Sequence, residues 1–169
     1  MTRQMSYSQM TPSQTKARAL ALLLPAALLA GAWGSQLIGG LVPCEMCHWQ
    51  RWPHYAAVVA AALAFVVPGR AVRLTLIAGA AALIAVSGLI GIFHAGVEYH
   101  WWQGITACST SVSGAGISTD EMLRRILAAP VVRCDAAQWK MFGISLAGYN
   151  AIFSLGGAAV IAWLIRRRA

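Results

Sequence analysis

Long apolar runs alternate with short polar segments along this chain, and the lengths of the runs predict helices that cross a membrane. A hydrocarbon core of about 30 Å takes roughly 20 helical residues at about 1.5 Å of rise each. Four runs are long enough, at about residues 19–41, 52–67, 74–97 and 144–165. The second run is the shortest, because a Pro-Gly pair at 68–69 ends it abruptly.

The predicted fold is an all-α membrane protein, an antiparallel four-helix transmembrane bundle with two extracytoplasmic loops. Mostly short links join the runs, as in up-and-down bundles. Residues 1–18 are expected to form a cytoplasmic N-terminal tail, and residues 19–166 a single four-helix transmembrane domain. Composition agrees, since 59% of the residues are hydrophobic and only 11% are charged, which is too apolar for a soluble domain of this size.

The positions of the charges orient the predicted bundle. Cytoplasmic loops of membrane proteins carry an excess of Lys and Arg. Basic residues flank the N-terminus, the link between the second and third runs, and the C-terminus: Arg3, Lys16, Arg18, Arg70, Arg73, Arg166, Arg167 and Arg168. Both termini are therefore expected inside, and the loops at 42–51 and 98–143 outside. The net charge of +8 is explained as a topology signal and requires no nucleic acid.

The N-terminus also resembles a secretory signal peptide. A basic segment and an apolar stretch precede Ala30-Gly31-Ala32, which mimics a small-residue cleavage site. The apolar character continues past that site to Val42, so a retained helix is favoured. Either interpretation places Cys44 outside the cytoplasm.

Four cysteines lie in the two loops expected outside, where disulfides form and persist. Cys44 and Cys47 form a Cys-x-x-Cys motif, and Cys108 and Cys134 share the second loop. Four cysteines permit three pairings, of which loop geometry favours Cys44 with Cys47 and Cys108 with Cys134. Exchange between the loops can follow through a mixed disulfide. A structural zinc site is the weaker hypothesis, because 25 residues separate the second two cysteines, and no metal is predicted.

Two other functions compete with redox exchange between thiols. Residues 44–48 read Cys-Glu-Met-Cys-His, which fits the attachment sequence of c-type haem. A membrane-anchored haem electron-transfer protein is the alternative, although it gives no role to Cys108, Cys134 or Arg51. A disulfide-stapled membrane scaffold without turnover is the third hypothesis.

Arg51 favours the redox hypothesis. It follows Cys47 by four positions, so the two share a face if the segment is helical. A guanidinium beside a thiol favours the reactive thiolate, and a cation at the bilayer edge can hydrogen-bond a quinone carbonyl. Pro53 complicates this geometry, because as the first residue of a helix it would leave Cys47 on the approach.

The second loop contains a helix signal of its own. Ser118 and Glu121 form a capping box, which predicts the start of a short helix. Leu123, Ile126 and Leu127 then fall on one face, so the helix is expected to be amphipathic and to lie in the membrane interface.

Several motifs together resemble the DsbB family of disulfide bond formation proteins. Pro-Cys-Glu-Met-Cys at 43–47 with Gln-Arg at 50–51 is similar to the first periplasmic loop of that family. His-Ala-Gly-Val-Glu at 94–98 resembles the end of its third helix. The segment from Cys134 through Gln138-Trp139 to 142–145 resembles the start of its fourth, and the likeness runs from about residue 17 to 166.

The resemblance implies a thiol–quinone oxidoreductase of the bacterial inner membrane. Such an enzyme reoxidises a periplasmic DsbA-type thioredoxin-fold oxidase and passes the electrons to ubiquinone or menaquinone. Cys108, paired with Cys134, would meet the partner, and Cys134 would then exchange with Cys44. Cys47 would contact the quinone, with Arg51 supporting the charge.

The histidine that the family places near the quinone has two counterparts by position, His94 and His100. His94 is the candidate quinone ligand, although a histidine at a helix end is more often merely interfacial. His54 is expected to be interfacial as well.

Overall fold

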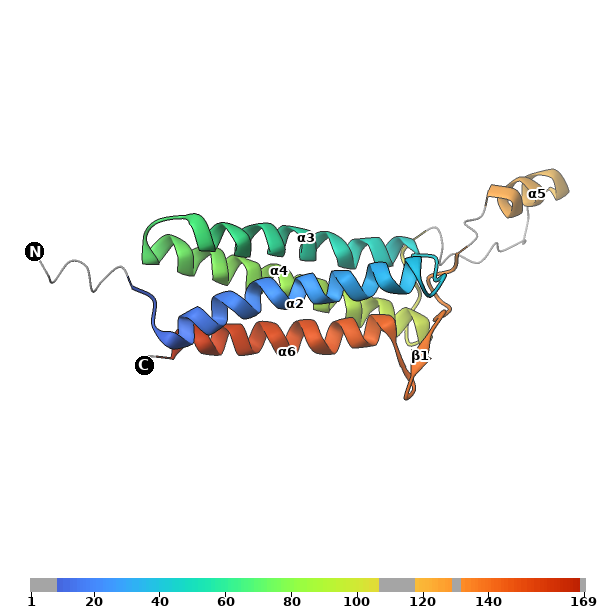
Figure 1. Ribbon diagram of the computed structural model, residues 1–169. Helices are drawn as coiled ribbons and strands as arrows, with labels where there is room; N and C mark the ends of the chain where they lie inside the picture. The colour runs from blue at the N-terminus through green and yellow to red at the C-terminus, as the bar shows by residue number, and fades with distance from the viewer. Residues whose placement is uncertain (1–8, 107–117, 129–131, 168–169) are drawn as a thin grey trace, which may run out of the picture.

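Four long helices lie side by side in the computed structural model, which describes residues 9–106, 118–128 and 132–167 (Figure 1). They are α2 (Pro12–Leu37), α3 (Glu45–Val66), α4 (Arg70–Glu98) and α6 (Leu146–Arg166). A short helix, α5 (Thr119–Ala128), and a hairpin of β1 (Lys140–Met141) and β2 (Ile144–Ser145) complete the described elements. The start of α2 and the end of α6 lie at one end of the bundle, and the hairpin lies at the other (Figure 1).

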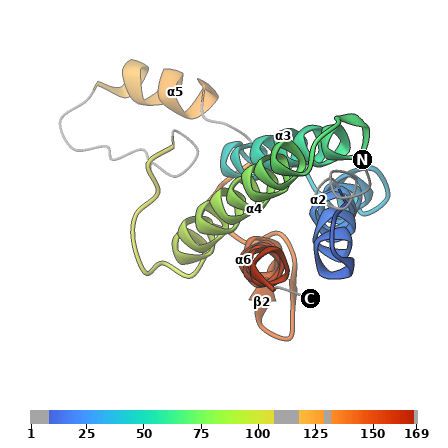
Figure 2. The same cartoon turned by 90° about the vertical axis from the view of Figure 1, so that its left-hand side faces the viewer.

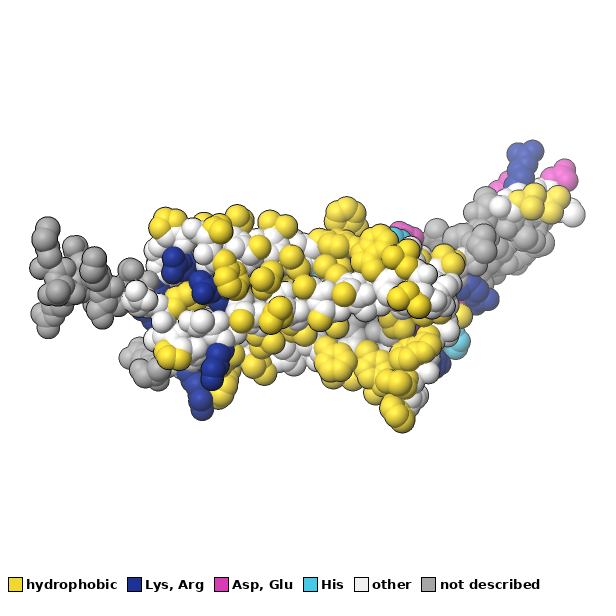
Figure 3. Space-filling view, in the orientation of Figure 1, with side chains coloured by type: hydrophobic (Ala, Val, Ile, Leu, Met, Phe, Trp, Pro, Cys, Tyr) yellow, Lys and Arg dark blue, Asp and Glu magenta, His cyan; other side chains and the backbone are white. Residues whose placement is uncertain are grey.

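Three of these helices, α2, α4 and α6, are long and apolar enough to cross a membrane. Helix α3 has a similar length, 22 residues, but its first half carries Glu45, His48, Arg51 and His54. Hydrophobic side chains cover the flank of the bundle in Figure 3, and Lys and Arg gather at the end where α2 starts and α6 ends. The chain is thus a multi-pass helical membrane protein.

Helices α2, α3 and α4 begin earlier in the polar segments than the apolar runs indicated, and α2 ends at Leu37 rather than near residue 41. Helix α2 begins at Pro12 rather than near residue 19, because Thr11 forms a capping box with Gln14. Helix α3 begins at Glu45 rather than near residue 52, so Pro53 lies inside it. Hydrophobicity marks the stretch that suits the membrane, whereas the backbone caps set where a helix begins.

Helix α4 is central and packs against both α3 and α6 (Figure 2). Small residues allow this close approach, and buried alanines dominate the interior. Gly91 shows how close the backbones come: a Cβ built on it would lie 3.0 Å from the Ala147 carbonyl oxygen of α6. Packing of this kind fixes the spacing between α4 and α6.

The hairpin corrects the expected start of the fourth helix. Residues 144 and 145 belong to β2, because Phe142 and Gly143 form a two-residue turn with φ of 50° and 79°. Tyr99 holds this turn to α4, donating to the Gly143 carbonyl at 2.7 Å and accepting from the Ser145 amide at 3.0 Å. Ser145 then caps α6 by accepting from the Gly148 amide.

The predicted short helix in the second loop is confirmed. Helix α5 spans Thr119–Ala128, and the Ser118 hydroxyl accepts from the Glu121 amide at 3.4 Å. Figure 1 shows α5 apart from the four-helix bundle. Its expected place in the membrane interface remains a prediction.

Replacing Gly91 with leucine should destabilise the bundle by about 1–3 kcal/mol, the usual cost of overpacking. The added side chain would meet the backbone of α6. Gly79→Leu is the matched control on the same helix, because no atom lies within 4 Å of a Cβ built there. Thermal unfolding in detergent measures both variants. If the two substitutions lowered the unfolding temperature equally, close α4–α6 packing at Gly91 would be contradicted.

Candidate functional site

The Cys-x-x-Cys motif forms the N-terminus of α3. Cys44 is the N-cap residue, and its sulfur accepts a hydrogen bond from the Cys47 amide at 3.3 Å. Both thiols are free, and their sulfur atoms lie 2.9 Å apart. Cys44 is buried and Cys47 half-buried. The positive end of the helix dipole therefore acts directly on the pair and favours a thiolate.

The two cysteines are not equivalent. The hydrogen bond between the thiols, together with burial, raises the pKa of Cys44 far above its ordinary value. Cys44 consequently keeps its proton near neutral pH and donates it toward Cys47. Cys47 is the member of the pair that is left to ionise.

A cavity of about 620 Å³ lies beside the cysteine pair. Its volume falls within the range of small-molecule sites. Apolar side chains of α2 and α6 form much of its wall, among them Leu28, Leu29 and Phe153. Cys44 and Cys47 line it together with a few polar side chains, so the thiols face a space that can hold a small apolar molecule with polar groups.

Arg51 also lines this cavity, one helical turn after Cys47. Its side chain donates to Gln36 Oε1 at 2.9 Å and to the Ala32 carbonyl at 3.2 Å, and its guanidinium lies 5.6 Å from the Trp33 ring centroid. The residue is only 8% exposed. Among the residues that the structure describes, no carboxylate lies within ion-pair distance of it. A buried cation whose charge is not neutralised thus faces the cavity.

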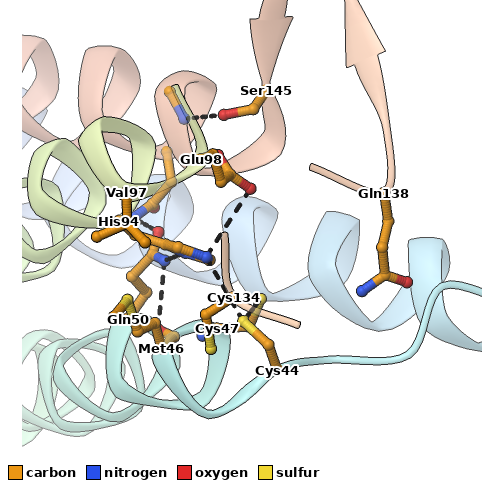
Figure 4. A network of polar contacts seen from close by, with 12 residues as sticks. Cys44, Met46, Cys47, Gln50, His94, Val97, Glu98, Cys134, Gln138 and Ser145 are labelled. Carbon is orange, nitrogen blue, oxygen red and sulfur yellow. Dashed lines mark hydrogen bonds and ion pairs between the residues drawn. The ribbon is translucent and has the colours of Figure 1, made fainter. Parts of the chain in front are cut away.

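His94 joins the cysteine pair from α4 (Figure 4). Its Nε2 lies 3.5 Å from Cys44 Sγ and 3.8 Å from Glu98 Oε1. Gln50 Nε2 donates to His94 Nδ1 at 2.7 Å and also to the Met46 carbonyl, which orients the amide. Because Nδ1 accepts, the neutral ring carries its proton on Nε2, the nitrogen that lies near both Cys44 Sγ and Glu98 Oε1.

Of the two histidines near the end of α4, only His94 reaches the cavity. His100 is exposed and has a φ of 59°, which turns the chain away after α4. The structure therefore brings together four of the predicted site residues: Cys44, Cys47, Arg51 and His94.

A chain of hydrogen bonds continues from His94 into the middle of the bundle. Asn150 of α6 donates to Gln50 Oε1 at 2.9 Å and accepts from His54 Nε2 at 3.0 Å. Ser87 of α4 donates to the Gln50 carbonyl at 2.8 Å and lies 2.9 Å from His54 Nε2. These bonds link three helices through the buried Gln50, His54 and Ser87 and the half-buried Asn150.

The expectation that His54 is interfacial is wrong, since its side chain is 3% exposed and lies within this network. Sequence reasoning also missed Gln50, Ser87 and Asn150. Helical spacing could have revealed part of the network. Gln50 precedes His54 by four positions, and Asn150 precedes Ser154 by four, so each pair shares one helix face.

The second cysteine loop reaches the same site. Cys134 is disulfide-bonded and fully buried, in one cluster with Cys44, Met46 and Val97 (Figure 4). Gln138 holds this loop to the segment before Cys44, accepting from the Val42 amide at 3.1 Å and donating to its carbonyl at 2.6 Å. Cys108 lies outside the described residues.

The fold and the site define a helical membrane protein with a reactive cysteine pair at the end of its bundle. The family model described as disulfide bond formation protein DsbB matches residues 14–164. The chain belongs to the DsbB family, and it is a membrane protein of disulfide-bond formation, an oxidoreductase.

Named relatives agree with the family. The chain is 30% identical to disulfide bond formation protein B of Marinobacter nauticus over 147 residues, 79% of this chain and 81% of the relative. It is 30% identical to disulfide bond formation protein B of Polaromonas sp. over 159 residues, 89% of this chain and 92% of the relative. An uncharacterized protein of Rickettsia prowazekii is 23% identical over 75% of this chain and 73% of its own length. No solved structure matches.

Removing Cys47 should make Cys44 reactive at lower pH. A raised pKa keeps the Cys44 thiol protonated, and the hydrogen bond to Cys47 is the largest cause of this raised pKa. Cys47→Ala removes that bond, so it should lower the pKa of Cys44 and allow the Cys44 thiolate to form at lower pH. The pH dependence of Cys44 alkylation by iodoacetamide, followed by peptide mass spectrometry, measures the shift. His48→Ala is the control, because His48 is exposed. An unchanged Cys44 profile in Cys47→Ala would refute the assignment.

Replacing Asn150 with leucine should destabilise the protein by about 1–3 kcal/mol, since it leaves Gln50 Oε1 without its donor in the bundle interior and removes one hydrogen bond of His54. Thr75→Val is the control: its exposed hydroxyl bonds only to the Ala71 carbonyl of its own helix. Thermal unfolding in detergent compares the two. The network would carry no stability if both variants unfolded at the wild-type temperature.

Proposed function

We propose that this protein is a thiol–quinone oxidoreductase that reoxidises a periplasmic DsbA-type oxidase and passes the electrons to a membrane quinone. The observation that carries the proposal is the arrangement at the cavity: a free cysteine pair and a buried, unneutralised arginine line the same 620 Å³ space. Membership of the DsbB family supports the same reaction.

The proposed topology has four membrane spans in the bacterial inner membrane. Helix α3 is the fourth span, because it lies in the bundle beside three helices that are apolar enough to cross. The cationic end of the bundle would be cytoplasmic, with both termini, and the cysteine end periplasmic. Residues 19–166 would then form the membrane domain.

The thiol chemistry uses both cysteine pairs. A thiolate of the reduced partner attacks Cys108 of a Cys108–Cys134 disulfide and releases the Cys134 thiolate. Cys134 attacks Cys44 of a Cys44–Cys47 disulfide and releases the Cys47 thiolate. The second partner thiol then attacks the partner's own sulfur in the mixed disulfide and releases the Cys108 thiolate, so the partner leaves oxidised. The position of Cys134 against Cys44, supported by Gln138, favours this route.

The residues of the cavity suit a quinone head group. Arg51 would donate hydrogen bonds to a carbonyl oxygen and stabilise negative charge there, and His94 would offer its Nε2 proton. Cys47 borders the same space. A bound ubiquinone or menaquinone would supply an acceptor for two electrons and two protons, which no amino-acid side chain offers.

The haem alternative requires His48 to act with the cysteine pair. His48 is exposed, whereas His94 lies against Cys44, so the geometry favours the thiol–quinone function. A haem stain of the purified protein tests the alternative directly.

Turnover with a reduced DsbA-type protein and a short-chain quinone tests the proposal, followed by quinone absorbance. Cys47→Ser and Cys108→Ser should abolish quinone reduction. Arg51→Gln should raise the KM for quinone about tenfold or more, because the free energy of a hydrogen bond to a charged group corresponds to at least that factor in affinity. Arg73→Gln is the control, because Arg73 lies at the opposite end of the bundle and bonds to the Val67 carbonyl. An intact rate in Cys47→Ser would overturn the proposal.

A further inference from the structure

Three potential metal ligands converge at the start of α3. Cys44 Sγ, Cys47 Sγ and His94 Nε2 all lie within 4.8 Å of one another. Two thiolates and an imidazole form a common ligand set for zinc. Sequence alone did not suggest this set, because the zinc hypothesis there involved only the two cysteine pairs. His94 comes from another helix, far away in the sequence.

The spacing of these atoms is close to that of a tetrahedral zinc site. At ordinary Zn–S and Zn–N lengths, tetrahedral ligand atoms lie about 3.5–3.8 Å apart. Cys44 Sγ and His94 Nε2 already lie 3.5 Å apart. The two sulfur atoms, at 2.9 Å, would have to separate. Cys47 borders the cavity and is only half-buried, so a small side-chain rotation provides that separation.

Glu98 is an independent indication of a cationic ligand. Its side chain is 8% exposed, and Oε1 lies 3.8 Å from His94 Nε2. Oε2 is buried and has no hydrogen-bond partner among residues 9–106, 118–128 and 132–167. A buried carboxylate oxygen without a partner is costly, and a metal ion beside His94 would satisfy it.

Gln50 controls whether His94 can bind a metal. His94 Nε2 must lose its proton to become a ligand, so Nδ1 must carry the proton instead. Gln50 Nε2 now donates to Nδ1. Rotating the amide by about 180° would present Oε1 as the acceptor, the arrangement that orients histidine ligands in zinc sites. This rotation would replace the bonds that Gln50 now makes to the Met46 carbonyl and to Asn150.

We propose that the reduced protein binds one Zn²⁺ through Cys44, Cys47 and His94, with Glu98 beside the fourth position. Binding would release the two thiol protons to solvent. Oxidation of Cys44 and Cys47 to their disulfide, with a quinone accepting the two electrons, would remove two ligands and expel the ion. Bound metal would in turn block thiol exchange. The site therefore responds to the redox state of the pair, and its formation requires neither quinone nor a protein partner.

Cobalt(II) titration of the reduced full-length protein in detergent tests the site, in a Cys108→Ser/Cys134→Ser background that leaves only Cys44 and Cys47. One equivalent should produce the thiolate-to-cobalt charge-transfer band and the visible bands of tetrahedral Co²⁺. His94→Ala should weaken binding at least about tenfold, and His48→Ala, which removes an exposed neighbouring histidine, should not. Gln50→Glu should tighten binding about tenfold or more.

Absence of the charge-transfer band in the reduced parent, or equal cobalt affinity in His94→Ala, would overturn the proposal. A second measurement needs no variant. In the wild-type protein, Zn²⁺ should protect Cys44 and Cys47 from alkylation, and EDTA should reverse that protection. Neither measurement involves quinone. Failure of quinone turnover with intact metal binding would therefore refute the oxidoreductase function alone.

Discussion

A polar group buried in a membrane bundle must find its hydrogen-bond partner inside the protein, and this constraint organises the molecule. Gln50, His54, Ser87, His94 and Asn150 form hydrogen bonds with one another across α3, α4 and α6. Their bonds require one register of the three helices, since sliding a helix by one residue would separate the pairs that it forms with the other two. The same bonds hold His94 against Cys44 at the open end of the bundle.

The site itself departs from that rule in two places. Arg51 keeps a charge that no carboxylate in the described residues neutralises, and Glu98 keeps a buried oxygen without a described partner. Both face the cavity that the cysteine pair borders. Among the described residues, only Arg18 Nε and His54 Nδ1 are further buried side-chain atoms without a hydrogen-bond partner. Most buried polar groups are therefore paired, and the two exceptions at the cavity indicate a ligand-binding site.

Sequence patterns predicted much of the fold because lipid imposes a simple length requirement on an apolar helix. These patterns did not predict where an element begins or ends when the local backbone conformation sets that boundary. The turn at Phe142–Gly143 depends on two positive φ angles, and hydropathy does not register these. The N-cap bond of Cys44 starts α3 well before the apolar run. Cys47 and Arg51 therefore share a helix face, as predicted, and Pro53 lies inside the helix rather than at its start.

By itself, the sequence determined the membrane class, the family, the cysteine motif and the face shared by Cys47 and Arg51. Each of these depends on composition or on residues close together in the chain. Only the tertiary structure decided that His94 and not His100 reaches the thiols, that Cys134 lies against Cys44, and that His54 belongs to the interior. These contacts join residues tens of positions apart, and helix packing sets them through close backbone approach, which no local pattern encodes.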